Sequence, residues 1–203
     1  MDIYIALAHY PVTNKRGELV ATAVTNLDIH DLARTARTYG VSGYYILTPV
    51  AQQRSLVSRI ISHWREGEGR NYNPIRAKAF ELVSIQEDLD SIIEDIEQKS
   101  GARPLTVVTG ANLDNNCMPY EALRQQIATQ PGTCLVIFGT GWGLSTDFIE
   151  RCDARLPAIR CRQPSDGYNH LSVRAAVAIV LDRLQGEREP FTDTVDIRSD
   201  GGK

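Results

Sequence analysis

Residues 134–145 read CLVIFGTGWGLS, an apolar run that leads directly into a glycine-rich loop. The run at 134–138 is short and rich in branched side chains, which predicts a strand buried on both faces of a sheet. Glycines at 139, 141 and 143 allow sharp turns and let the backbone approach a ligand closely, offering its amides to it. Because ligands bind beyond the carboxyl ends of parallel strands, this loop is a candidate binding site.

The spacing of these glycines argues against two common nucleotide sites. A dinucleotide-binding fingerprint is GxGxxG after the first strand with an acid about 20 residues later, whereas this loop is GxGxG on a late strand with Ile159 at the acid's position. No GxxxxGK[ST] phosphate loop occurs in the chain. A Rossmann-like nucleotide enzyme is therefore disfavoured, and a plain glycine-rich turn with Trp142 as a lid on the core remains an alternative.

The rest of the chain alternates short apolar runs with helical patterns. Strands are predicted at 3–8, 43–47, about 80–85, 105–108, 134–138 and 156–159. Helices are predicted from a cap at Asn26 or Asp28 to Gly40, from Ala51 onward, and at 75–79, 88–99, 120–128 and 171–184, with a polar loop at 66–74. This alternation predicts an α/β fold: a mostly parallel sheet with helices on both faces.

Length and composition predict one globular domain at 1–185, followed by a polar, flexible tail at 186–203. No run approaches about 18 consecutive apolar residues, and the start MDIYI has an acid where a signal peptide has basic residues. We therefore expect a cytoplasmic protein with no membrane association. The four cysteines form no CxxC and no metal-ligand spacing with histidine, so free thiols and no metal site are expected.

The net charge of −3 argues, taken alone, against nucleic-acid binding. The charges are unevenly distributed, however: residues 51–80 carry six basic residues against two acidic ones, and residues 81–100 carry one basic residue against seven acidic ones. Two solvated helix faces would explain this segregation equally well. The charge pattern is thus compatible with a local basic surface for nucleic acid but does not by itself predict one.

Three features together resemble the SPOUT (α/β-knot) RNA methyltransferases. They are the FGTGWGLS loop at 138–145, a short strand at 156–159, and NHLSV at 169–173 opening an apolar helix. Those enzymes typically carry an FG-x-E/T-x-x-GL loop and an LN-x-SV-A helix start. The nearer match is the predicted SAM-dependent RNA methyltransferase group of that superfamily, and the resemblance extends through HYPV at 9–12 and TNLDIHD at 25–31 to residue 184.

This resemblance implies a doubly wound sheet whose C-terminal segment forms a trefoil knot. It also implies that S-adenosylmethionine is held by backbone groups of three loops, in a snug, largely apolar slot. The cofactor-binding residues carried over are Thr109, Gly110, Ala111, Phe138, Gly139, Thr140, Gly141, Gly143, Leu144, Ile159, Leu171 and Ser172. Thr140 or Trp142 stands where the family usually has an acid or another polar residue.

Candidates for catalysis and RNA binding are less distinctive. Asp166 and Asn169 are placed like the general-base region of some relatives, although a turn at 166–167 and a helix cap at 169 are the structural alternatives. His9 and His30 are expected to be structural, with His9 worth testing because it ends a strand. The candidate phosphate-binding residues are Lys15, Arg16, Arg54, Arg76 and Arg162.

The helix predicted at 171–184 is apolar nearly all round, so two of its faces must be covered. A second copy of the chain is the expected cover, with a deep core position as the alternative. The resulting hypothesis is an S-adenosylmethionine-dependent RNA methyltransferase that acts on tRNA as a homodimer built around this helix. The alternative is a non-catalytic knotted module that binds RNA or the cofactor without turnover.

Overall fold

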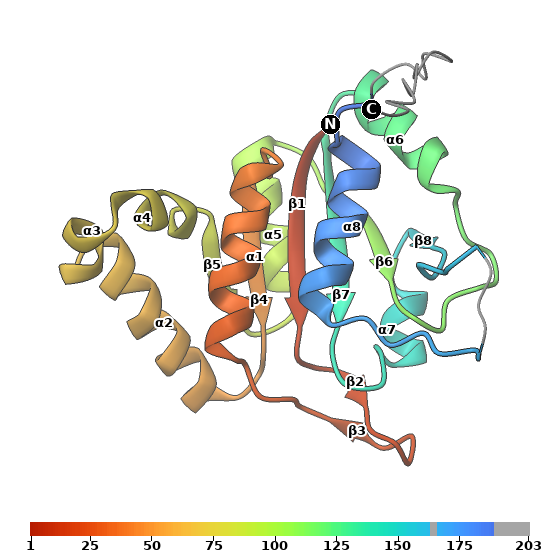
Figure 1. Cartoon of the computed structure of the whole chain (residues 1–203), viewed down its shortest axis with the longest axis horizontal. Helices are drawn as coiled ribbons and strands as arrows, with labels where there is room; N and C mark the ends of the chain where they lie inside the picture. The colour runs from red at the N-terminus through yellow and green to blue at the C-terminus, as the bar shows by residue number, and fades with distance from the viewer. Residues whose placement is uncertain (163–165, 189–203) are drawn as a thin grey trace, which may run out of the picture.

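Six parallel strands form one sheet in the computed structural model, which describes residues 1–162 and 166–188 (Figure 1). The strand order is β5-β4-β1-β7-β6-β8, and every neighbouring pair is parallel. The strands are β1 (Asp2–Ala8), β4 (Gly43–Leu47), β5 (Val83–Gln86), β6 (Leu105–Thr109), β7 (Thr133–Gly139) and β8 (Ala154–Leu156). The predicted α/β fold with a parallel sheet is confirmed.

Helices cover both faces of the sheet, as predicted. One face packs against α1 (Asn26–Thr38), α2 (Ala51–Arg65), α4 (Pro74–Phe80), α6 (Tyr120–Thr129) and α8 (Val173–Gln185). The other packs against α5 (Leu89–Ser100) and α7 (Thr146–Glu150), which lie behind the sheet in Figure 1. Strand β1 shows the cause: alternate side chains point to opposite faces, so Ile5 and Leu7 enter one core while Ala6 enters the other.

The chain reverses direction across the sheet at β1. It proceeds from β1 to β4 and β5 on one side, then returns through β6 and β7 to pair β7 with the free edge of β1. A small antiparallel hairpin of β2 (Val12–Thr13) and β3 (Leu19–Val20) follows β1 and projects beyond the carboxyl ends of the strands (Figure 1). In open α/β sheets, such a reversal places a crevice at the strand ends.

Several local predictions need correction. Residues 68–72, expected to be part of a polar loop, form the short helix α3 (Glu68–Tyr72), and α7 was not predicted at all. The last strand lies at 154–156 and not at the predicted 156–159, because residues 154–156 are the ones that pair with β6. Helix α1 is capped neither by Asn26 nor by Asp28: the Thr25 hydroxyl accepts the Asp28 N–H.

Helix α8 begins two residues later than predicted, because the Ser172 hydroxyl caps it by accepting the Ala175 N–H. Its inward side, including Val177, Val180 and Leu181, is fully buried against the protomer's own core. Small and apolar residues on its other sides, such as Ile179, are only partly covered. Of the tail predicted at 186–203, residues 189–203 lie outside the described residues. No helix in the described ranges has the length and apolarity to cross a membrane.

Candidate functional site

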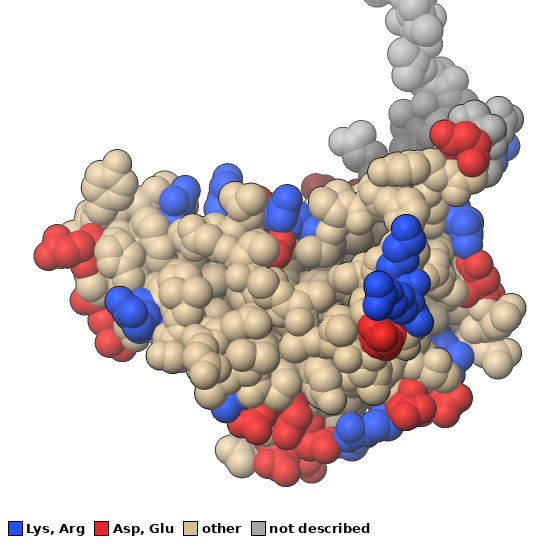
Figure 2. All heavy atoms as spheres, turned by 90° about the horizontal axis from the view of Figure 1, so that it is seen from below, with Lys and Arg blue, Asp and Glu red and all other residues tan. Residues whose placement is uncertain are grey.

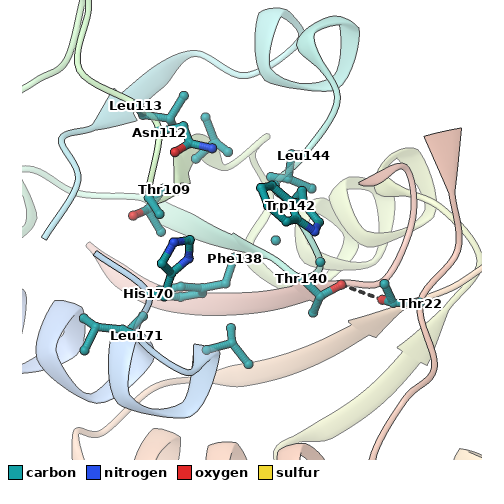
Figure 3. Close-up of a pocket in the computed structure, with 18 of the residues that line it drawn as sticks. Thr22, Thr109, Asn112, Leu113, Phe138, Thr140, Trp142, Leu144, His170 and Leu171 are labelled. Carbon is teal, nitrogen blue, oxygen red and sulfur yellow. Dashed lines mark hydrogen bonds between the residues drawn. The ribbon is translucent and has the colours of Figure 1, made fainter. Parts of the chain in front are cut away.

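A cavity of about 590 Å³ opens at the carboxyl ends of β1, β6 and β7. Its size falls within the roughly 300–1,000 Å³ typical of small-molecule sites. Figure 3 shows the labelled side chains of three loops facing one another across it: Asn112, Leu113, Trp142, Leu144, His170 and Leu171. The loops follow β6, β7 and β8, so segments about 60 residues apart in sequence meet at one point.

Most of the predicted cofactor residues lie on this cavity. Eleven of the twelve line it, namely Thr109, Gly110, Ala111, Phe138, Gly139, Thr140, Gly141, Gly143, Leu144, Ile159 and Leu171. The exception is Ser172, whose side chain is used as the cap of α8. Apolar side chains and backbone make up most of this part of the wall, which suits an uncharged ring system better than a phosphate.

The glycine-rich loop is fastened to the β2–β3 hairpin. The Trp142 N–H donates to the Thr13 carbonyl (3.1 Å), the Thr13 N–H donates to the Gly143 carbonyl (2.9 Å), and the Ser145 N–H donates to the Pro11 carbonyl (3.1 Å). The Gly143 N–H itself donates to the Thr140 carbonyl (3.1 Å). The amides of residues 142, 143 and 145 therefore already have acceptors within the protein and are not the free amides that were expected of this loop.

Gly141 shows why glycine is needed in this loop. Its φ of +60° lies in the left-handed region, and a Cβ there would stand 3.1 Å from the Thr13 carbonyl oxygen. Both conditions favour glycine, because a side chain would carry backbone strain and push the hairpin away. The glycine thus permits a close approach between two parts of the protein as well as to a ligand.

A chain of hydroxyl groups joins the end of β1 to the glycine-rich loop. The His9 Nδ1 lies 3.0 Å from the Thr22 hydroxyl, which lies 2.6 Å from the Thr140 hydroxyl (Figure 3 shows the Thr22–Thr140 contact). The Thr140 hydroxyl in turn donates to the Ala8 carbonyl (3.2 Å). His9, Thr22 and Thr140 all line the cavity. From the sequence, Thr140 was expected at the site and His9 was expected to be structural but worth testing, whereas Thr22 was not singled out.

The His9 side chain is almost fully buried, with 1% of its surface exposed. Burial lowers the pKa of His9 to about 4, and the nearby Asp28 carboxylate opposes this shift only in part. The imidazole is therefore neutral at pH 7. Its Nε2 is buried and has no hydrogen-bond partner among the described residues, which is a costly arrangement unless a ligand supplies one.

An ion pair between α1 and α8 forms part of the same cavity wall. The Arg174 Nη1 donates to the buried Asp28 Oδ1 (2.7 Å), and Arg174 Nε lies 3.6 Å from Asp31 Oδ2. The Thr25 hydroxyl donates to the second Asp28 oxygen (2.5 Å). Sequence reasoning missed this pair, since nothing in local spacing links residues 146 positions apart.

The two candidate catalytic residues differ in placement. Asn169 lines the cavity, and it is not a helix cap because Ser172 takes that role. Asp166 is absent from the cavity's lining, and its Oδ1 accepts the Tyr168 N–H (2.9 Å), which is the turn arrangement that was the structural alternative. The structure therefore places only Asn169 where it can touch a bound ligand.

Two of the predicted phosphate-binding arginines make contacts within the protein. Arg54 pairs with Glu87 (2.8 Å) and donates to the Thr48 carbonyl, while the Arg76 guanidinium stacks 5.2 Å from the centre of the Trp64 ring. These contacts hold the two side chains but leave both of them partly exposed.

The other three basic candidates are exposed on loops. Lys15 and Arg16 lie in the turn between β2 and β3, and Arg162 lies in the connection between β8 and α8. Seen from below, the face on which the strands end is mostly uncharged, apart from one compact group of basic side chains with an acidic one beside it, and further basic and acidic groups lie around its rim (Figure 2). A continuous basic surface is therefore not visible on this face.

Comparisons with known proteins agree with this geometry. Residues 2–186 match a protein family described as SAM-dependent RNA methyltransferase. A tRNA (guanine-N(1)-)-methyltransferase of Oleidesulfovibrio alaskensis is 44% identical over 186 residues, covering 92% of this chain but 42% of that protein. The chain thus spans less than half the length of that relative. An uncharacterized protein of Aquifex aeolicus is 43% identical, covering 90% of this chain and 88% of the other.

Solved structures share the fold at much lower identity. The SpoU methyltransferase AviRb from Streptomyces viridochromogenes, determined in complex with AdoMet, is 16% identical with a TM-score of 0.54. That likeness covers 90% of this chain and 56% of the other. At this identity the comparison establishes a common architecture only.

Proposed function

The chain belongs to the SAM-dependent RNA methyltransferase family, and we propose on this basis that it transfers a methyl group from S-adenosylmethionine to tRNA. The observation that carries the proposal is the convergence of three predicted loops on one cavity of about 590 Å³ at the strand ends. The choice of tRNA is supported by the name of the Oleidesulfovibrio alaskensis relative.

The cavity fits the cofactor in size and in chemistry. Apolar side chains such as Phe138, Leu144 and Ile159 can enclose an adenine ring, and the backbone of residues 109–111 can supply polar contacts. When bound, S-adenosylmethionine supplies an electrophilic methyl group on a sulfonium. The role of the chain is to hold an RNA acceptor atom in line with that group and to exclude water.

We propose that the segment leading into α8 forms the trefoil knot of this fold. In support, the chain after β8 is held to the loop after β6, where the Ala158 N–H donates to the Leu113 carbonyl (2.9 Å). It then lines the cavity at 169–171 before α8 packs beside α1 on one face of the sheet.

We also propose a homodimer through α8. The helix has apolar residues on sides that its own protomer only partly covers, and a symmetric contact with α8 of a second copy would cover them. In this assembly Lys15, Arg16 and Arg162, the exposed basic residues on loops, would hold RNA phosphates near the cavity, with Arg54 and Arg76 as secondary contacts. The proposed location is the cytoplasm, where tRNA and the cofactor both occur.

A non-catalytic module that holds RNA or the cofactor is the second candidate. The position of Asp166 outside the cavity favours it, because one of the two candidate bases is thereby removed from the site. Asn169 and His9 remain at the cavity as side chains that could take part in a transfer reaction. Substituting them would therefore distinguish an enzyme from a binding module.

Calorimetry with S-adenosylhomocysteine tests the proposal at its first step. We expect binding at one site per chain with a Kd near 1 μM, equivalent to about 8 kcal/mol, and no binding of NAD⁺ or ATP. Absence of heat with S-adenosylhomocysteine, or preference for NAD⁺, would remove the methyltransferase assignment.

A further inference from the structure

The cavity has a second wall, distinct from the three loops expected to hold the cofactor. His9 at the end of β1, Thr22 after the hairpin, and the Asp28–Arg174 pair between α1 and α8 form it. If the loops hold S-adenosylmethionine, these residues line the rest of the cavity, where the molecule that receives the methyl group would bind. The inference below therefore rests on the proposed function.

The hydroxyl chain on this wall fixes the protonation of His9. Each threonine hydroxyl has one proton, and the Thr140 hydroxyl donates its proton to the Ala8 carbonyl. The Thr22 hydroxyl then gives its own proton either to Thr140 (2.6 Å) or to the His9 carbonyl (3.5 Å), and in both cases its oxygen is left to accept from Nδ1 of His9. The imidazole consequently carries its proton on Nδ1, and Nε2 presents a lone pair.

That lone pair has no hydrogen-bond partner among the described residues. Because only 1% of the His9 side chain is exposed, bulk water does not supply one. The Asp28 carboxylate, the charged group that acts on His9, is already bonded to Arg174 and Thr25 and is an acceptor itself. Nothing described on the protein side therefore donates to Nε2. The complementary group is an N–H or O–H donor on a ligand in the cavity.

We propose that Nε2 of His9 accepts a hydrogen bond from the N–H or O–H group of the RNA that receives the methyl group, and takes its proton. As the acceptor atom bonds to the methyl carbon, the carbon–sulfur bond breaks, its electron pair stays on sulfur, and the acceptor's proton passes to Nε2. The neutral state of His9 at pH 7 leaves Nε2 available before each transfer.

Two variants separate the functions of the two ring nitrogens. His9→Asn keeps a donor near the position of Nδ1, and so the Thr22 contact, but removes the acceptor. Thr22→Val keeps the side-chain shape but removes the group that fixes the tautomer. His30→Asn is the matched control, because His30 also has a buried, unpartnered ring nitrogen but lies among Trp64 and Phe80, outside the cavity lining.

The measurements are tritium transfer from labelled S-adenosylmethionine to tRNA, S-adenosylhomocysteine affinity, and circular dichroism of each variant. We expect His9→Asn to lower the transfer rate at least 100-fold and Thr22→Val at least 10-fold, with the cofactor-product Kd changed less than twofold. His30→Asn should keep the wild-type rate.

A folded His9→Asn protein with a rate within threefold of wild type would overturn the inference. A tenfold loss of S-adenosylhomocysteine affinity in that variant would overturn it too, by showing that Nε2 contacts the cofactor. If His9→Asn does not fold, the test rests on Thr22→Val. A tritium transfer rate equal to that of the wild type in this variant would count against the inference. Failure of the proposed function itself is seen separately, as absence of binding and transfer in the wild type.

Discussion

Individual polar residues decide the chemistry of the cavity, because most of its wall is apolar side chain and backbone. His9, Asp28 and Thr109 are buried there, and each buried polar group needs a partner to avoid a large desolvation cost. Asp28 has its partners in Arg174 and Thr25. His9 has a partner at one ring nitrogen only, so its behaviour with pH and with ligand carries the most information.

Burial of neutral His9 should make stability depend on pH. The pKa of about 4 in the folded protein lies below the usual value of 6.5, so the unfolded chain takes up this proton first as pH falls. The stabilisation is therefore complete above pH 6.5 and is lost toward pH 4. Between pH 7 and pH 5, urea unfolding of the wild type should lose about 2 kcal/mol more than that of His9→Asn. Equal losses would show that His9 is not buried in its neutral form.

Gly141 and Gly17 offer a matched pair of left-handed glycines. Alanine at either position should lower the free energy of unfolding by about 1–2 kcal/mol through backbone strain. Only at Gly141 does a Cβ also press on the hairpin, at 3.1 Å from Thr13, whereas Gly17 has open space. We expect Gly141→Ala to weaken S-adenosylhomocysteine binding about tenfold in calorimetry, and Gly17→Ala to leave it unchanged. The same affinity in both variants would contradict the placement of the loop.

At the scale of elements, the sequence pattern predicted the bounds of a helix or strand correctly where the structure of each residue depends on its neighbours in sequence. The strand at 43–47 was predicted with both its ends, because five buried residues lie between turn signals. Helix α3 was missed because EGRNY is short, polar and contains glycine, and its packing against α2 and α4 stabilises it. The end of β8 at Leu156 depends on pairing with β6, which no local pattern encodes.

The site was predictable to the same extent. The three loops could be identified through the resemblance to the SPOUT enzymes, and eleven of the twelve residues expected to bind the cofactor line the cavity. The second wall was not predictable, since His9, Asp28 and Arg174 come together only through the order of the strands and the packing of α1 on α8. Likewise, the amides of the glycine-rich loop were expected to be free because the docking of the hairpin is a long-range contact.

The contact between α1 and α8 should depend on the ion pair between them. Arg174→Met leaves the buried Asp28 carboxylate without its main partner, so we expect a loss of about 2–3 kcal/mol in unfolding free energy. Asp28→Asn together with Arg174→Met should cost less than the sum of the single changes. A double-mutant cycle from urea denaturation measures the coupling, and additive effects would show that the pair does not link the helices.

At the scale of the whole molecule, the order of the strands and helices places three regions at different parts of the surface. The cavity lies at the carboxyl ends of the central strands, the helices α2, α3 and α4 lie at the β5 end of the molecule, and α8 lies on one face of the sheet (Figure 1). Because Val177 on α8 is fully buried in its own protomer, charge there would unfold the chain rather than test association. The partly covered positions of α8 are the ones that test the dimer.

Ile179→Glu should therefore convert a dimer into a monomer, since an unpaired carboxylate in an apolar contact is strongly unfavourable. Sedimentation measures the assembly, and circular dichroism confirms that the protomer is folded. The control is Leu56→Glu, which changes a residue that is 51% exposed on α2. A folded Ile179→Glu protein that sediments like the wild type would place the interface elsewhere.

Transfer of tritium from methyl-labelled S-adenosylmethionine to tRNA tests the central claim most directly. The tRNA should come from cells that lack the protein, so that its target nucleotide is unmodified. Our account predicts that the wild-type protein labels this RNA in proportion to time and enzyme. It would be contradicted if the protein bound S-adenosylhomocysteine but left the RNA unlabelled, which is the behaviour of a binding module.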